Sequence, residues 1–121
     1  MAIEFSVDNR RIADDRHIVA VTGEIDLFTA PEFKQHVAAP IDEGVAHVVI
    51  DLTNTTFIDS SSLGVLIGAH RRLKLRGGSL AIVCSNEAIV KTFRVTGLDG
   101  VFTLVPTIDD ALDGDAAVGT G

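Results

Sequence analysis

Four consecutive polar residues, Asp59-Ser60-Ser61-Ser62, form the part of the sequence best suited to chemistry. They follow an apolar strand pattern and precede an amphipathic helix pattern, so they lie where a helix begins. Backbone N–H groups at a helix N-terminus favour an anion, so the fold would tolerate a phosphate on one of these serines. The simpler interpretation is that the serines only cap the helix. One capping serine would be enough, and the spacing alone leaves both interpretations open.

The same run also suggests a serine hydrolase. Ser60, Ser62 and Gly64 match the Gly-x-Ser-x-Gly nucleophile turn except at its first position. That fold requires a histidine after the serine, and His70 is the last histidine of the chain. On one helix, the eight residues from Ser62 to His70 span about 12 Å. A general base must lie within hydrogen-bond reach, so we predict that the chain is not an enzyme.

Other catalytic and cofactor motifs are missing from the sequence. His17, His36 and His47 have no metal-binding spacing with one another or with Cys84, the single cysteine. The pair Gly77-Gly78 lacks the lysine and hydroxyl residue of a phosphate-binding loop. We therefore expect no metal and no cofactor.

The composition is typical of a small globular domain. The chain has 121 residues, 46% of them hydrophobic, and a net charge of −7 that disfavours nucleic acid and anionic membranes as partners. The first residues carry Glu4 and do not resemble a signal peptide, and no apolar run is long enough to cross a membrane. We expect a cytoplasmic protein with one domain over residues 1–113 and a disordered tail over residues 114–121.

Hydrophobic periodicity predicts the elements that position the serine run. Strands are predicted over residues 3–7, 17–21, 45–52, 79–84 and 101–105, and helices from residue 29 to about 40 and over residues 62–76, 86–95 and 107–112. A polar turn is predicted over residues 9–16. The order ββαβαβαβα indicates an α/β fold with a mixed, mainly parallel sheet, its first strand at an edge.

The helix after the serine run has two distinct faces. Leu63, Leu66 and Leu73 lie on the face expected to pack on the sheet, whereas Val65 and Ala69 lie on the opposite face. The two apolar residues are therefore predicted to be exposed. Isolated exposed apolar residues are common, but beside a polar loop they are also typical of a partner surface.

Asp26 follows the second predicted strand as Asp59 and Ser60 follow the third. If the two strands are neighbours, Asp26 and Ser60 lie at the same edge of the domain. The alternative is that Asp26 only assists the N-terminus of the next helix.

Three segments resemble the STAS domains of bacterial anti-sigma factor antagonists. They are Gly23-Glu24-Ile25-Asp26, the run from Phe57 through Asp59-Ser60-Ser61-Ser62-Leu63-Gly64 to Leu66, and Arg76-Gly77-Gly78-Ser79-Leu80. The similarity extends over residues 3–113. It implies the STAS fold and a protein-binding function: the unphosphorylated protein binds an anti-sigma factor, itself a serine kinase, and so releases a sigma factor.

The resemblance also implies a switch and a partner surface. The kinase phosphorylates the first serine after the aspartate, here Ser60, which ends the complex, and a serine phosphatase reverses the modification. The implied partner-binding residues are Asp26, Asp59, Ser60, Ser61, Ser62, Val65 and Ala69. Ser62 departs from the family, which commonly has glycine there. The alternative function within the family is an interaction module of a sensory or transport complex.

Overall fold

The computed structural model describes residues 3–112, and the predicted tail of residues 114–121 lies outside them. Its elements are β1 (Ser6–Ala13), β2 (Arg16–Ile25), α1 (Ala30–Asp42), β3 (His47–Ile58), α2 (Ser60–Leu75), β4 (Ser79–Val83), α3 (Glu87–Val95), a 3₁₀ turn η1 (Leu98–Gly100) and β5 (Thr103–Val105). A last helical segment covers residues 108–112. The predicted element order is confirmed.

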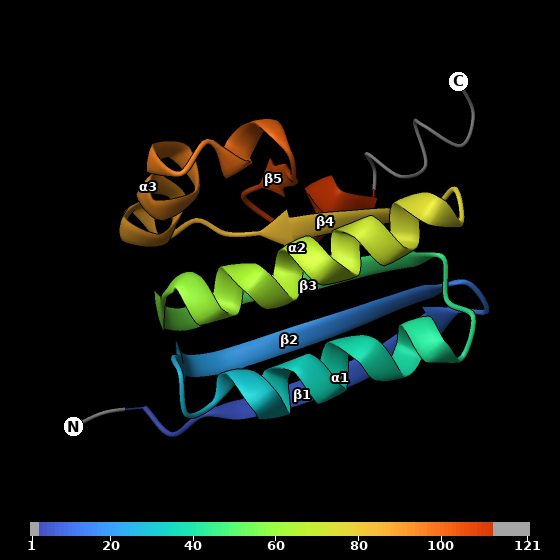
Figure 1. Cartoon of the computed structure of the whole chain (residues 1–121), viewed down its shortest axis with the longest axis horizontal. Coiled ribbons are helices and arrows are strands. Elements are labelled where there is room, and N and C mark those ends of the chain that lie inside the picture. The colour runs from blue at the N-terminus through green and yellow to red at the C-terminus, as the bar shows by residue number, and fades with distance from the viewer. Residues whose placement is uncertain (1–2, 113–121) are drawn as a thin grey trace.

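The five strands form one sheet in the order β1-β2-β3-β4-β5 (Figure 1). β1 pairs with β2 in an antiparallel manner, and all other neighbours are parallel. This confirms the predicted mixed, mainly parallel sheet and the edge position of the first strand.

The two faces of the sheet are covered unequally. α1 and α2 lie side by side on one face, where the main core also includes side chains of α3 (Figure 1). The opposite face has a smaller core of Ile18, Val49, Ala81, Val83 and Ala111, closed by the helical segment of residues 108–112. Because α1 and α2 share one face, each covers part of the other.

β3 is longer than its apolar segment predicts. It continues through the polar residues 53–56 because β2 continues to pair with it as far as the register pair Ile25 and Ile58. The buried Thr55 satisfies its hydroxyl by donating to the Val21 carbonyl at 2.8 Å. The pairing brings the carboxyl ends of β2 and β3 to the same edge of the sheet.

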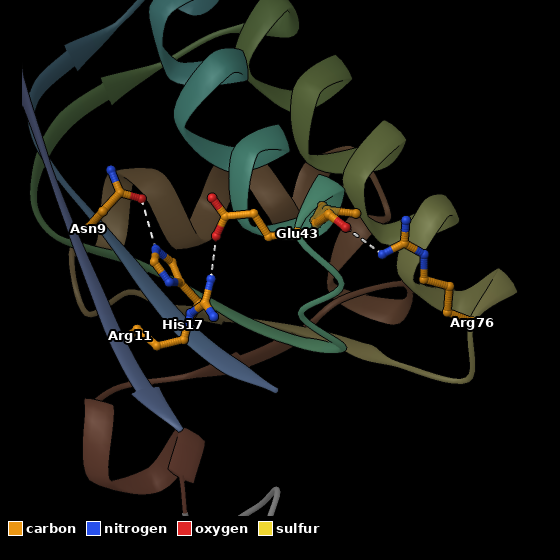
Figure 2. A network of polar contacts seen from close by, with 6 residues as sticks. Asn9, Arg11, His17, Glu43 and Arg76 are labelled. Atoms are coloured by element: carbon orange, nitrogen blue, oxygen red, sulfur yellow. Dashed lines mark hydrogen bonds and ion pairs between the residues drawn. The ribbon is translucent and has the colours of Figure 1, made fainter. Parts of the chain in front are cut away.

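The prediction of a turn over residues 9–16 is wrong, because β1 runs to Ala13 and pairs with β2 up to its last residue, which faces Arg16. Polar contacts to the end of α1 and to β2 stabilise this polar strand (Figure 2). Arg11 donates to Glu43 at the end of α1 at 2.5 Å, and the Nε2–H of His17 donates to the side-chain oxygen of Asn9 at 2.9 Å. His17 is buried, and this burial lowers the pKa of its imidazole. The positive charge of Arg11 lowers the pKa further, to a smaller extent.

The far end of α2 is fixed against α1 and β3. Arg76 donates to the Ile41 carbonyl at 2.5 Å (Figure 2). Gly78 approaches the backbone of Ala46 so closely that a Cβ atom there would lie 2.0 Å from the Ala46 oxygen. These contacts fix the C-terminal end of α2 against the end of α1 and the start of β3.

Candidate functional site

Asp59 caps α2, and the helix begins at Ser60 rather than near residue 62 as predicted. Asp59 has an extended backbone, and its Oδ1 accepts from the backbone N–H groups of Ser61 at 3.0 Å and Ser62 at 3.2 Å. The Ser61 hydroxyl also donates to this oxygen, at 2.5 Å. These hydrogen bonds, that of the Ser61 hydroxyl first, lower the pKa of Asp59. The N-cap residue is therefore the aspartate and not one of the serines.

The three serines have different environments. Ser60 is exposed, and its hydroxyl makes no hydrogen bond within the described residues. Ser61 is half-buried, and its hydroxyl hydrogen is donated to Asp59. Ser62 has an exposed fraction of 0%. Of the three hydroxyls, that of Ser60 is therefore the one that is both exposed and free of a hydrogen bond within the described residues.

Ser62 connects the ends of two elements. Its hydroxyl donates to the carbonyl of Ile25, the last residue of β2, at 2.5 Å. It also accepts from the backbone N–H of Asp59 at 3.2 Å, which completes a capping box. Ser62 therefore cannot contact a partner directly in this conformation, and its place in the predicted partner surface is wrong. Its hydroxyl instead ties the serine turn to the loop that follows β2.

Asp26 begins that loop, at the sheet edge where Asp59 begins α2, which confirms that the two strand ends are neighbours. One carboxylate oxygen of Asp26 accepts from the backbone N–H groups of Phe28 at 2.9 Å and Thr29 at 3.0 Å. The Thr29 hydroxyl donates to the Glu24 carbonyl at 2.9 Å and accepts from the Asp26 N–H. Asp26 thus fixes the backbone at the start of α1, which agrees with the alternative that it assists the N-terminus of this helix. Its side chain remains half-exposed at the same edge.

The loop presents two residues that the sequence analysis missed. Leu27 is 70% exposed and Phe28 is 88% exposed, although both are large and apolar. A signal was present in the sequence, because both lie between the end of a strand and the Thr29–Pro31 start of a helix. At such a position neither strand nor helix periodicity offers a buried face.

α1 and α2 enclose a groove of about 500 Å³ that begins beside the serine turn. It is lined by Lys34, Val37, Ala38 and Ile41 of α1 and by Ser61, Gly64, Val65, Gly68, Ala69 and Arg72 of α2. Val65 is half-buried, and Ala69 is only 6% exposed. The prediction that Ala69 is exposed is therefore wrong, because α1 covers that side of α2. Val65 retains partial access to solvent at the groove.

Within residues 3–112, no group of three or more His, Cys, Asp or Glu side chains is arranged to hold a metal ion. In the same part of the chain, no helix has the length and hydropathy required to cross a bilayer. The serine turn and the loop after β2 lie at one edge of the sheet, and the groove begins beside Ser61 of the same turn.

Comparisons with known proteins agree on one family. The model of the STAS domain matches residues 9–111. An anti-sigma-B factor antagonist of Listeria monocytogenes is 32% identical over 106 residues, which cover 86% of this chain and 91% of that protein. The crystal structure of an anti-sigma factor antagonist from Mycobacterium paratuberculosis is 32% identical with a TM-score of 0.83, covering 92% of this chain and 93% of the other. The anti-sigma factor antagonist SpoIIAA in its unphosphorylated form shares the fold, with a TM-score of 0.80 at 18% identity over 93% of this chain and 97% of its own.

Proposed function

Because this chain belongs to the STAS domain family, among the anti-sigma factor antagonists, we propose that its unphosphorylated form binds a serine-kinase anti-sigma factor and thereby releases a sigma factor. The proteins of this family are regulators rather than enzymes, in agreement with the prediction that the chain has no catalytic activity. We further propose that the kinase ends the complex by phosphorylating Ser60, that a serine phosphatase restores it, and that the cycle takes place in the cytoplasm.

The accessible hydroxyl of Ser60 is the observation that carries the proposal. Ser60 is exposed at the first position of α2, whereas the hydroxyls of Ser61 and Ser62 are engaged inside the turn. A kinase must bring the γ-phosphate within bonding distance of the acceptor oxygen, and Ser60 offers an exposed hydroxyl that no described hydrogen bond engages. The positive end of the α2 dipole favours the resulting negative charge, while the N–H groups of Ser61 and Ser62 are already donated to Asp59.

Charge supplies the means of release. A phosphoserine adds about −1.5 to −2 charges at neutral pH. At Ser60 this charge would join the carboxylates of Asp59 and Asp26, which lie at the same edge. A partner that buries poorly paired charge loses about 2–5 kcal/mol, and hence binds about 30- to several-thousand-fold more weakly.

The proposed partner surface extends from this edge along the groove. Asp26, Asp59, Ser60 and Ser61 form its polar end, and Val65 provides apolar contact beside α1. Ala69 lies in the groove wall and shapes it rather than projecting from it. A Val65→Arg substitution should abolish capture of the anti-sigma factor while leaving the circular dichroism spectrum unchanged.

The test uses purified chain and the serine-kinase anti-sigma factors of the source organism, with ADP and then with ATP. We expect wild type to bind one of them with ADP and to dissociate with ATP as Ser60 is phosphorylated, as read by mass spectrometry. Ser60→Ala should stay bound with ATP, whereas the matched control Ser61→Ala should still be released. A phosphopeptide at Ser61 or Ser62 with Ser60 unmodified would refute the phosphosite. Binding to other STAS proteins or transporter subunits, with none to any kinase, would refute the function.

A further inference from the structure

We propose that Phe28, supported by Leu27, anchors the chain to its anti-sigma factor by entering an apolar pocket with a basic rim beside the kinase active site. This inference rests on the proposed function and names the part of the partner that the β2–α1 loop recognises.

The exposure of this loop is the first step. Phe28 is 88% exposed and Leu27 70% exposed, next to each other in the chain. An aromatic side chain that becomes buried removes about 150–250 Å² from water, and aromatic residues are enriched at protein interfaces. The two side chains therefore offer a concentrated apolar contact at this edge of the sheet.

The loop is also held in one conformation. The Asp26 carboxylate accepts from the Phe28 and Thr29 N–H groups, and the Thr29 hydroxyl donates to the Glu24 carbonyl at 2.9 Å. A loop whose backbone is already fixed loses little conformational freedom on binding. Exposed apolar residues in such a loop are suited to insertion into a pocket.

Proximity to Ser60 identifies the partner. The Ser62 hydroxyl, two residues after Ser60, donates to the carbonyl of Ile25, two residues before Leu27. An interface of standard size buries about 800 Å² on each protein, equivalent to a disc of about 16 Å radius. A kinase active site centred on Ser60 must therefore cover the loop as well.

Charge defines the rim of the pocket. Glu24 precedes the loop and Glu32 lies in the first turn of α1, and both are exposed. Asp26 adds a third acidic side chain at the base of the loop. Basic side chains around the partner's pocket would complement these carboxylates and steer the encounter.

The experiment compares Phe28→Ser and Leu27→Ser with the matched control Leu75→Ser. Leu75 is 86% exposed but lies at the opposite end of α2 from Ser60. Binding is measured by calorimetry with ADP and the serine-kinase anti-sigma factor that wild type binds, and folding by circular dichroism. We expect at least an about 30-fold loss of affinity for Phe28→Ser, a smaller loss for Leu27→Ser, and less than an about twofold change for Leu75→Ser.

Two results would overturn the inference. If Phe28→Ser binds like Leu75→Ser while Ser60→Asp binds poorly, the loop is not an anchor although the proposed function stands. If Phe28→Ser instead abolishes self-association in sedimentation and leaves kinase binding unchanged, a second copy of this chain is the occupant. Failure of wild type to bind any serine-kinase anti-sigma factor refutes the proposed function itself, together with this inference.

Discussion

Replacing Ser62 with alanine removes one buried hydroxyl that makes two hydrogen bonds, and its cost can be estimated from the structure. The side chain has 0% exposure, donates to the Ile25 carbonyl at 2.5 Å and accepts from the Asp59 N–H at 3.2 Å. Without the hydroxyl, the Ile25 carbonyl and the Asp59 N–H both lose this hydrogen-bond partner at a buried position. Loss of such a buried partner costs about 1–3 kcal/mol. For a domain of this size that corresponds to a decrease in melting temperature of about 4–12 °C.

Urea unfolding followed by circular dichroism measures this free energy directly. Ser60→Ala is the matched control, because it removes an exposed hydroxyl on the same helical turn and should change stability by less than about 0.5 kcal/mol. Ser62→Gly should cost more than Ser62→Ala, by up to about 1 kcal/mol, because glycine disfavours the helix.

The reasoning would be refuted by one clear result. If Ser62→Ala unfolds within about 0.5 kcal/mol of wild type while Ser60→Ala does the same, the hydroxyl of Ser62 is not the connection between α2 and the end of β2. An increase in the stability of Ser62→Ala would refute the reasoning in the same way.

Three further predictions concern other contacts of the fold. Asp59→Ala should cost about 1–2 kcal/mol in urea unfolding, through loss of the cap. The hydrogen bond from the Ser61 hydroxyl lowers the pKa of Asp59 in the folded state. The stability that this group contributes is therefore complete above the ordinary aspartate pKa of about 4 and is lost as the pH falls through the lower folded pKa. Asp59→Ala should flatten that part of a stability–pH profile. Burial lowers the pKa of His17, so the unfolded chain takes up a proton that the folded chain resists, and stability should decrease as the pH falls through about 6.5; His17→Gln should reduce this decrease. Gly78→Ala should cost more than about 3 kcal/mol or prevent folding, because its Cβ would lie 2.0 Å from the Ala46 oxygen. Expression level and thermal unfolding measure this effect, and an increase of stability would contradict the contact.

Sequence periodicity predicted the elements whose residues are mostly apolar. The buried segment of β3 and the sheet-facing side of α2 were found from it, because alternation and helical spacing report burial directly. β1 was placed too early and cut short, since its polar residues have no such pattern. Asn9 and Arg11 belong to a strand because His36 and Glu43 at α1 offer them partners, and those partners are distant in sequence.

The candidate site was predicted in position but only partly in detail. The run after β3 and the acid after β2 were correctly placed at one edge, because parallel strands end together. Helical spacing gave the angle of Ala69 around its helix but could not show that α1 lies beside it. Nor could spacing decide which residue caps α2, because Asp59 and each serine are all good N-caps. Only the hydrogen bonds to Asp59 and to the Ile25 carbonyl distinguish the free Ser60 hydroxyl from the engaged hydroxyls of Ser61 and Ser62.

The geometry of the cap bears on how the proposed switch works. The Ser60 hydroxyl makes no hydrogen bond within residues 3–112, so phosphorylation there breaks no described contact within the chain. The Asp59 carboxylate is held by two backbone N–H groups and a hydroxyl, so we expect it to keep its position when a phosphate is added to Ser60. Under these conditions the modification adds charge to a fixed surface instead of rearranging the fold. A switch of this kind acts mainly on the partner, because the partner must desolvate a negative charge that the chain itself leaves in water.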